Sequence, residues 1–393
     1  MEAERRQDEV FGCIPHGARA WHEKDLLPWG LRKSFGPCKQ YYIYSMRVKQ
    51  LLLFEEESDL LESQDKNEDS KNASCGLASS SVKESFSICD IPFLGCDFAV
   101  VYPAVAFLVP EERVLFTDFG VNAAVMCEII CSAICHQINW IFLRESVYNY
   151  TKENPEWLQP CNLSEMGSRH LSLLLGSYHK KEKIKAEERA AILRAVGRWS
   201  KQYKEIKDVF LDGQHALRRQ EEVYSSLQKC VAFASDPEGK KANLLLQKLS
   251  SISDLCGIDR YAKPAIDYHL LRLYLRRGLL LARTKYANMY VRNPEIERKE
   301  NTVAALRELC SKILRQISLC TDQSISTINQ IEWQVARSVC QRECPDCELK
   351  GEGARWLKPE FSKCPFHHTC IAYNYPSEKL MFVREPAYKG TSY

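Results

Sequence analysis

The sequence lacks any run of 18 or more apolar residues, the length that a membrane-spanning helix requires. Its first residues, MEAERRQDEVFGC, also lack the apolar stretch of a secretory signal, because charged residues interrupt them. Neither sign of charge dominates, since 54 Lys and Arg stand against 51 Asp and Glu and the net charge is +3. We therefore expect an intracellular protein (nuclear, cytoplasmic or in an organelle) that does not contact a membrane, and we expect a monomer.

Cysteine is not lacking, and the chain has 18. Without a secretory signal, this number favours a reducing compartment, where thiols stay free or bind metal. Five cysteines lie in the last 60 residues: Cys340, Cys344, Cys347, Cys364 and Cys370. The outer members are spaced C-x6-C and C-x5-C, and such short loops bring four soft ligands to one centre at small entropic cost. Free buried cysteines are the alternative, but the spacing predicts a metal site, with iron and zinc both open.

Composition divides the chain into segments of different character. One is acidic, then Ser-rich and poor in large apolar residues, which predicts disorder. The predicted segments are an N-terminal region of unknown role (1–54), a disordered insert (55–88), a β-leaning segment (89–117), a helical domain (118–338), a Cys-rich metal tail (339–376) and a C-terminal tail (377–393).

Hydrophobic periodicity is helical almost throughout from about residue 118. The stretch 122–150 is apolar over several turns and predicts one buried helix. Gly and Pro punctuation predicts further helices near 163–176, 183–208, 214–234, 240–255, 265–290, 300–319 and 322–340. The predicted fold class is mainly α, with a mixed α/β region at the N-terminus.

A basic stretch runs from Arg260 to Arg292, with eight basic residues and one acid, Asp267. The missing acids favour a phosphate-binding surface over an ordinary solvated helix face. Asp267 comes directly before a predicted helix, where a carboxylate caps free N–H groups at the positive end of the helix dipole. Capping alone would explain Asp267, with His269 a packing or surface residue and Arg272 a helix charge.

The hexad from Asp267 to Arg272 reads D-Y-H-L-L-R and resembles the D-x-H-x-x-R segment of helix–hairpin–helix base-excision DNA glycosylases, of the endonuclease III and adenine-mismatch type. Those families carry a C-x6-C-x2-C-x5-C cluster motif behind this segment. KCPFHHTCIAYN (363–374) is similar to the adenine-mismatch tail. The resemblance covers roughly residues 118–375 and implies a helix–hairpin–helix body.

The resemblance also implies a 4Fe-4S cluster held by four of the tail cysteines, namely Cys340, Cys347, Cys364 and Cys370. The middle spacing departs from the family pattern, with 16 residues in place of two. A zinc site that uses Cys344 together with Cys347, Cys364 and Cys370 therefore stays open.

The activity that the resemblance implies is excision of a damaged or mismatched base from DNA, by a hydrolase acting on N-glycosidic bonds. Asp267 would stabilise the positive charge that builds on the sugar as the bond breaks. GKKAN (239–243) is similar to the family's G-R-K-T-A-N, although the preceding Gly-x-Gly is absent. Lys241 or Lys240 would then attack the sugar and add lyase activity.

The same resemblance assigns residues that contact DNA. Gln137, in EIICSAICHQINW (128–140), is similar to a Gln that approaches the DNA from an early helix of the superfamily. The remaining candidates for nucleic-acid binding are Lys240, His269, Arg272, Arg276 and Arg277. Contacts between such cations and phosphates weaken steeply with salt.

Two other functions stay open. CPFHHTCIAY (364–373) is also similar to a stretch of the queuosine-salvage nucleosidases, helical N-glycosidases with an Asp in a D-Y-R-type segment. The substrate would then be a modified nucleoside or an RNA-derived nucleotide. The other alternative is a non-catalytic nucleic-acid-binding protein with a structural metal site, in which an Asp267→Asn substitution would be harmless.

Overall fold

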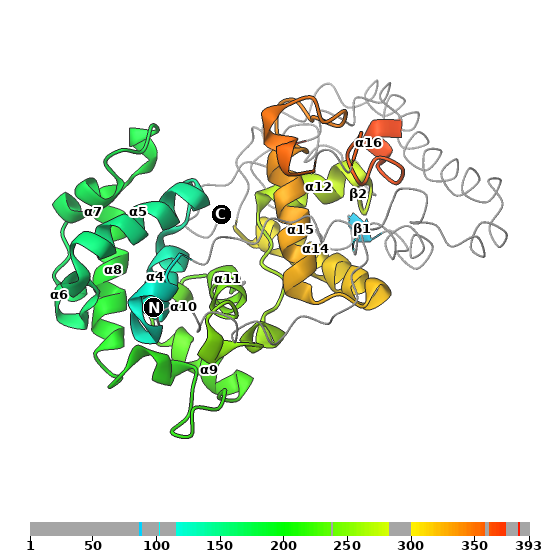
Figure 1. The fold of residues 1–393 in the computed structure, drawn as a ribbon. Coiled ribbons are helices and arrows are strands. Elements are labelled where there is room, and N and C mark those ends of the chain that lie inside the picture. The colour runs from blue at the N-terminus through cyan, green and yellow to red at the C-terminus, as the bar shows by residue number, and fades with distance from the viewer. Residues whose placement is uncertain are drawn as a thin grey trace, which may run out of the picture. The chain divides into compact units, whose positions relative to one another are not determined.

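The computed structural model describes residues 86–88, 102, 115–236, 239–282, 300–357, 361–374 and 384–385. All of them belong to one compact unit, Ser58–Tyr393. The fold is mainly helical, as predicted, and its described strands form one two-stranded sheet (Figure 1). None of the described helices is both long and apolar enough to cross a membrane.

A first helical group surrounds one hydrophobic core that is contiguous in sequence, from Phe116 to Ala262. Its helices are α4 (Val121–Ile134), α5 (Trp140–Glu153), α6 (Pro160–Ser164), α7 (Ser168–Leu175), α8 (Ala186–Ser200), α9 (Gln220–Gln228), α10 (Val231–Ala234) and α11 (Lys240–Leu249). Helix α4 is buried from Ala124 to Ile134 and packs against α8 and α11, as expected of a helix that is apolar on all sides.

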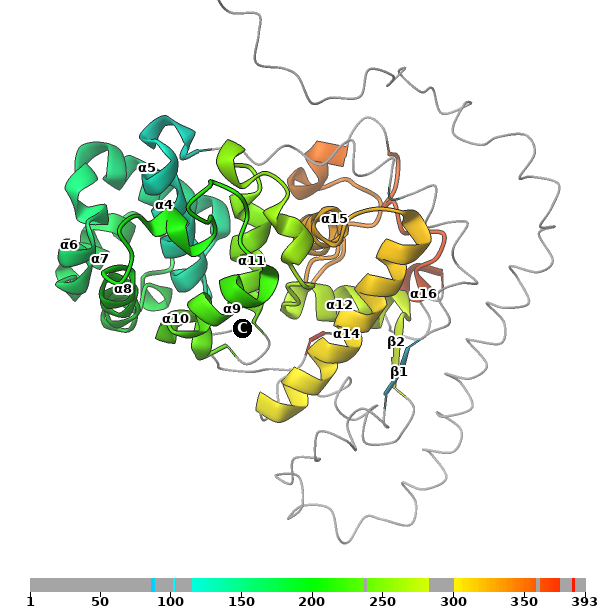
Figure 2. The same ribbon diagram turned by 90° about the horizontal axis from the view of Figure 1, so that it is seen from below.

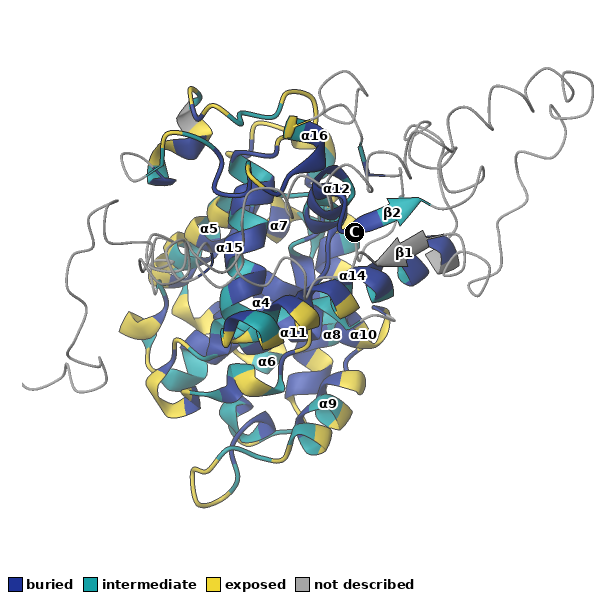
Figure 3. Cartoon of the chain, turned by 90° about the vertical axis from the view of Figure 1, so that its right-hand side faces the viewer, coloured by how far each residue is buried: buried dark blue, intermediate teal, exposed yellow. Residues whose placement is uncertain are grey.

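A second helical group surrounds another core, formed mainly by residues from Ile266 onward. Its elements are α12 (Tyr268–Arg277), α14 (Glu300–Thr321), α15 (Ile325–Ser338), α16 (Ile371–Asn374), and the antiparallel strands β1 (Phe86–Ile88) and β2 (Leu280–Ala282). Helix α12 packs against α14 and α15 (Figure 2). The buried residues of α12 and α14 are dark blue in Figure 3.

Short 3-10 helices connect the longer elements. They are Thr117–Phe119, Pro155–Leu158, Lys181–Lys183, Ile206–Val209, Ser253–Leu255, Ile258–Tyr261 and Glu352–Leu357.

The single helix predicted for 122–150 is wrong, because a loop between α4 and α5 divides it. Gln137 adopts a left-handed backbone conformation there, with φ of 56°. Asn139 then caps α5, because its Oδ1 accepts hydrogen bonds from the N–H groups of Ile141 and Phe142 at 3.0 and 3.2 Å. The break places the intervening side chains at the edge of the first helical group.

The predicted helix near 265–290 is shorter than expected, since α12 ends at Gly278. Gly278 has φ of 70°, which favours glycine, and a Cβ there would lie 2.2 Å from the Ile371 side chain. The glycine therefore both ends α12 and lets α16 approach it closely.

Several predictions for the N-terminal third lie outside the described residues. The region of unknown role (1–54) and residues 55–85 of the predicted disordered insert are among them. The end of that insert, Phe86–Ile88, forms β1 and is ordered, contrary to the prediction. Of the β-leaning segment 89–117, Tyr102 and residues 115–117 are described.

Candidate active site

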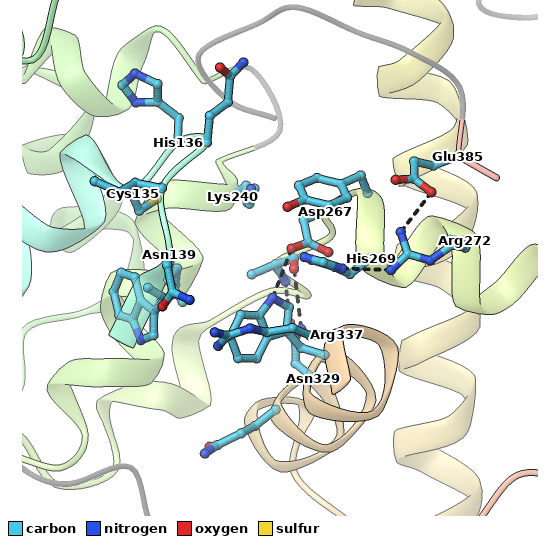
Figure 4. Close-up of a pocket in the computed structure, with 18 of the residues that line it drawn as sticks. Cys135, His136, Asn139, Lys240, Asp267, His269, Arg272, Asn329, Arg337 and Glu385 are labelled. Atoms are coloured by element: carbon cyan, nitrogen blue, oxygen red, sulfur yellow. Dashed lines mark hydrogen bonds and ion pairs between the residues drawn. The ribbon is translucent and has the colours of Figure 1, made fainter. Parts of the chain in front are cut away.

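A cleft of about 810 Å³ lies between the two helical groups. The loop after α4 and the start of α11 line one wall, and the start of α12 and one face of α15 line the other (Figure 4). The described charged residues of its lining are mostly cations: Lys180, Lys183, Lys240, Lys248, Arg272, Arg337 and Arg342, against Asp267 and Glu385. The lining also carries four large aromatic side chains, Trp140, Tyr178, Tyr268 and Trp333.

Asp267 caps α12, as the sequence predicted, and also lines the cleft. Its Oδ1 accepts a hydrogen bond from the Leu270 N–H at 3.1 Å, and its Oδ2 accepts one from Trp333 Nε1 at 3.0 Å. Burial raises the pKa of this carboxyl, but His269, Lys240 and the Leu270 N–H outweigh burial, so the pKa lies below its ordinary value. The cleft therefore contains an oriented carboxylate that is ionised at neutral pH.

His269 and Arg272 lie beside this carboxylate on the same helix. The Arg272 Nη2 atom lies 2.9 Å from His269 Nδ1, and its Nη1 atom is paired with Glu385 at 2.9 Å. His269 is partly buried and lines the cleft (Figure 4). The structure thus brings Asp267, His269 and Arg272 together, and it adds Glu385, which the sequence did not indicate.

Arg276 does not form a surface for DNA phosphates. It is 1% exposed, and its guanidinium donates to the carbonyls of Gln341 and Arg342 at 2.5 and 2.6 Å. Arg272 is also 1% exposed and donates to the carbonyls of Cys340 and Ala336 at 2.9 and 3.0 Å. These arginines close the end of α15 and hold the tail that follows it.

Arg277 is 1% exposed as well and belongs to a buried polar group. It pairs with Glu332 at 2.9 Å, donates to the Tyr102 hydroxyl at 3.0 Å, and lies over the Phe366 ring at 3.9 Å. The hydroxyls of Tyr102 and Tyr274 both donate to Glu332. The prediction that Arg276 and Arg277 bind a nucleic-acid backbone is wrong, because both guanidinium groups are inside the protein and have internal partners.

The loop that carries Gln137 is fixed by hydrogen bonds from a buried arginine, Arg189. Arg189 is 0% exposed and donates to the carbonyls of Ile134, Lys183, Ile184 and His136. These bonds join the end of α4 to the segment that carries the cleft lysines. Gln137 lines the cleft, as its predicted role requires.

Lys240 and Lys241 are the first two residues of α11, and their side chains have different surroundings. Lys240 lines the cleft on the wall that faces Asp267 (Figure 4). Lys241 is 2% exposed and is absent from the lining, and burial lowers the pKa of its ammonium group. Of the two lysines named from the sequence, the structure therefore brings Lys240 toward Asp267, and Lys241 packs behind it.

Sequence reasoning did not identify three residues on α15 that line the cleft. Asn329, Trp333 and Arg337 follow one another at four-residue steps and share one face of the helix. Arg337 lies over the Trp333 ring at 5.1 Å. The four-residue spacing was visible in the sequence, but nothing local indicated that this face meets Asp267.

Four of the five tail cysteines come together in the structure. Besides burial, the nearby Cys340 thiol raises the pKa values of Cys347, Cys364 and Cys370, and Cys370 raises those of Cys347 and Cys364, which places these four side chains close together. Cys344 is exposed. Burial is the main cause of the rise, to about 12 for Cys347 and about 11 for Cys370. Four thiols at this spacing would ionise together only with a cation or a cluster among them.

Arg276 lies between two of these thiols. Its Nη1 is 3.5 Å from Cys340 Sγ, and its carbonyl oxygen accepts from Cys370 Sγ at 3.6 Å. The Cys364 N–H also donates to the Cys347 carbonyl at 2.8 Å, which joins the two cysteine pairs. Within the described part of the chain, no group of three or more His, Cys, Asp or Glu side chains has an arrangement that would hold a metal ion.

Comparison with known proteins adds nothing to this geometry. No protein-family model matches the chain, and a search of curated proteins gives no significant match.

Proposed function

We propose that this protein is a DNA glycosylase of the helix–hairpin–helix type, which excises a damaged or mismatched base through Asp267. The observation that carries the proposal is a buried, ionised carboxylate, held by two hydrogen bonds in a cleft that cations and aromatic side chains line. Cations suit a phosphate backbone, and aromatic rings suit an extruded base.

Asp267 would act by electrostatics. Cleavage of an N-glycosidic bond builds positive charge on the sugar ring, and a carboxylate fixed beside the anomeric carbon lowers the barrier. Because Leu270 and Trp333 hold one oxygen each, the carboxylate does not have to reorganise during the reaction. The carboxylate can also orient the attacking water.

The opposite wall would bind and open the duplex. Gln137 lies on a loop fixed by Arg189, and it would fill the space that the extruded base leaves. Lys180, Lys183 and Lys240 on this wall would contact phosphates. A lyase step needs an amine at the anomeric carbon, and we assign that role to Lys240 because Lys241 does not line the cleft.

The four gathered cysteines fit a 4Fe-4S cluster. The outer cysteine pairs keep the x6 and x5 spacings of the glycosylase cluster motif, and the four thiols lie near one another. Arg276 contacts one of them, where a cation would help to stabilise a thiolate. Cys340, Cys347, Cys364 and Cys370 would hold it, and its work would be structural, since it would fix the tail against α12.

The test of activity uses labelled duplexes that each carry one damaged or mismatched base, with alkali to reveal abasic products. We expect at least one duplex to be processed, and Asp267→Asn to lower the single-turnover rate by roughly 10³-fold while binding survives. The asparagine oxygen can still cap α12, which separates catalysis from folding. Asp254→Asn, at an exposed position outside the cleft, is the matched control.

Two outcomes would replace this proposal. Turnover of free nucleosides or nucleoside 5′-monophosphates, with every duplex inert, would indicate a salvage nucleosidase. Tight DNA binding without turnover, unchanged by Asp267→Asn, would indicate a non-catalytic binding protein.

The test of the cluster is anaerobic purification with metal analysis and a visible spectrum. We expect about four irons per chain and a broad absorption near 400 nm, both lost in Cys364→Ser and both retained in Cys344→Ser. One zinc per chain, or retention of iron in Cys364→Ser, would contradict the cluster assignment.

A further inference from the structure

The imidazole of His269 has unusual surroundings in the first turn of α12. Its ring centre lies 4.1 Å from that of Tyr268 and 6.3 Å from that of Trp333, which it meets edge to face. All three side chains line the cleft next to Asp267. The ring is therefore held in place by aromatic neighbours and stands where a flat heterocycle bound in the cleft would meet it.

The hydrogen bond to Arg272 determines where the proton of His269 lies. A guanidinium group has only donors, so the Arg272 Nη2 atom at 2.9 Å must donate to His269 Nδ1. Nδ1 then contributes a lone pair, and a neutral ring must carry its proton on Nε2. The structure thus selects one of the two tautomers.

Arg272 is itself prevented from moving. It is 1% exposed, and its remaining donors bind Glu385, the Cys340 carbonyl and the Ala336 carbonyl at 2.9 to 3.0 Å. Glu385 comes from the far end of the chain, 113 residues after Arg272. A fixed donor at Nδ1 also disfavours the doubly protonated ring, since imidazolium would need that lone pair.

The charge state of His269 agrees with this geometry. Burial lowers the pKa of His269 to about 4, with Arg272, Arg337 and Lys240 acting in the same direction and Asp267 in the opposite one. At neutral pH the ring is therefore uncharged. Because Nδ1 already accepts a hydrogen bond from Arg272, the ring does not act as a base, and because the imidazolium form is not populated at neutral pH, it does not act as a general acid. The role that remains is donation of a hydrogen bond from Nε2–H.

We propose that His269 is a second catalytic residue, a neutral imidazole whose Nε2–H donates a hydrogen bond to the base as it leaves. This proposal rests on the glycosylase function proposed above. When the bond between the sugar C1′ and the base nitrogen breaks, its electron pair goes to the base, which becomes an anion. His269 stabilises that negative charge, while Asp267 stabilises the positive charge on the sugar.

The reaction is completed by water. The water oxygen bonds to C1′, and one water proton reaches the base nitrogen through solvent, so that a free base and an abasic sugar are the products. His269 keeps its own proton throughout. Its contribution is greatest for bases that are poor leaving groups, because these carry the most concentrated charge.

The first test needs no substrate. Protein labelled with ¹⁵N-histidine is examined by NMR, and the His269 signals are identified by their loss in His269→Gln. We expect the Nε2–H tautomer throughout roughly pH 5.5–8, above the pKa of about 4. An Nδ1–H tautomer, or an imidazolium ring at pH 7, would overturn the proposal whatever the protein's activity.

The second test is kinetic and uses the duplex that the protein processes. We expect His269→Phe to lower the single-turnover rate by about 10²–10³-fold with little change in duplex affinity. His269→Gln, whose amide N–H can replace Nε2–H, is expected to retain the rate within about tenfold. His179→Phe is the control, since this exposed histidine contacts Tyr178 in a similar way.

These outcomes separate the two proposals. If Asp267→Asn is inactive but His269→Phe processes every duplex at the wild-type rate, the donor role is wrong and the glycosylase function stands. If no duplex is processed at all, the glycosylase function fails, and the donor role fails with it even where NMR finds the Nε2–H tautomer.

Discussion

The arginines of α12 and the lysines of the cleft differ in what their charges do. Arg272, Arg276 and Arg277 are buried, and they bind carbonyl oxygens and carboxylates inside the protein. Lys180, exposed, and Lys183, half-buried, face the open cleft. A guanidinium presents five donors in a fixed fork and suits several internal acceptors, whereas an ammonium group on a flexible stem suits a solvated anion. For these residues, burial against internal acceptors therefore distinguishes structural cations from cleft-facing ones better than the density of charge does.

The largest effect is expected where a buried charge loses its partner. Arg277→Met leaves Glu332, which is 0% exposed, without its cation, and we expect about 3–5 kcal/mol less unfolding free energy. Adding Glu332→Gln should recover part of this loss, because the amide oxygen still accepts from the two tyrosines. Urea denaturation measures both variants. Arg219→Met, which removes the cation of an exposed ion pair, should leave the free energy of unfolding unchanged. A loss as large as that of Arg277→Met would contradict the difference between buried and exposed cations.

A second effect, on the pH dependence of stability, is expected from His136, which lies near several cations on the cleft wall that faces Asp267. Burial, helped by Arg189, Lys241 and Lys185, lowers the pKa of His136 from 6.5 to about 2. Below pH 6.5 the unfolded chain therefore binds a proton that the folded chain does not, and stability falls as the pH falls. From pH 6.5 to about pH 4.5 this contributes a loss of about 2–3 kcal/mol.

His136→Gln should remove that part of the acid sensitivity. Urea denaturation from pH 7.5 to about 4.5 should give a flatter profile for the variant than for the wild type. His179→Gln, at an exposed position, should leave the profile unchanged. Parallel profiles for His136→Gln and wild type would show that His136 binds a proton in the folded protein.

The smallest effect is expected from removing cleft lysines, and it should appear in binding alone. The double variant Lys180→Ala and Lys183→Ala should fold with wild-type stability. Its affinity for a duplex with an abasic-site analogue should depend less on salt, with the slope of log K against log salt reduced by roughly 2. Fluorescence anisotropy measures the slope. The control is the double variant Lys152→Ala and Lys201→Ala, since both lysines are exposed and outside the cleft. An equal reduction of the salt slope in that variant would show that the cleft lysines do not bind the duplex.

Local chemistry explains what the sequence allowed us to predict. The N-cap role of Asp267 depends on its own helix, so it could be recognised from neighbouring residues. The metal site of the tail stays a prediction. Trp333 and Glu385 could not be found this way, because they reach Asp267 and Arg272 from 66 and 113 residues away. The basic run was misread for a related reason. Arg272 and Arg276 are buried because carbonyls at and after the end of α15 accept hydrogen bonds from them, and composition does not reveal those partners.

The break between α4 and α5 is an intermediate case. Residues 135–139 contain neither Gly nor Pro, and the apolar pattern continues through them. The single local indication was Asn139, a strong N-cap residue placed before Trp140. The fold uses this break to expose Gln137, so the exception to helical periodicity coincides with the candidate site.

The two hydrophobic cores differ in how the chain would assemble them during synthesis. The first is continuous from Phe116 to Ala262 and can close as soon as that stretch has left the ribosome. The second core joins Tyr102, which comes before the first core in the sequence, to Phe366, which comes after it. The centres of these two rings are 5.4 Å apart. Closing so long a loop is slow. We therefore expect the first core to form early and the second one late, because Tyr102 can reach its partners only after the chain has been made as far as Phe366.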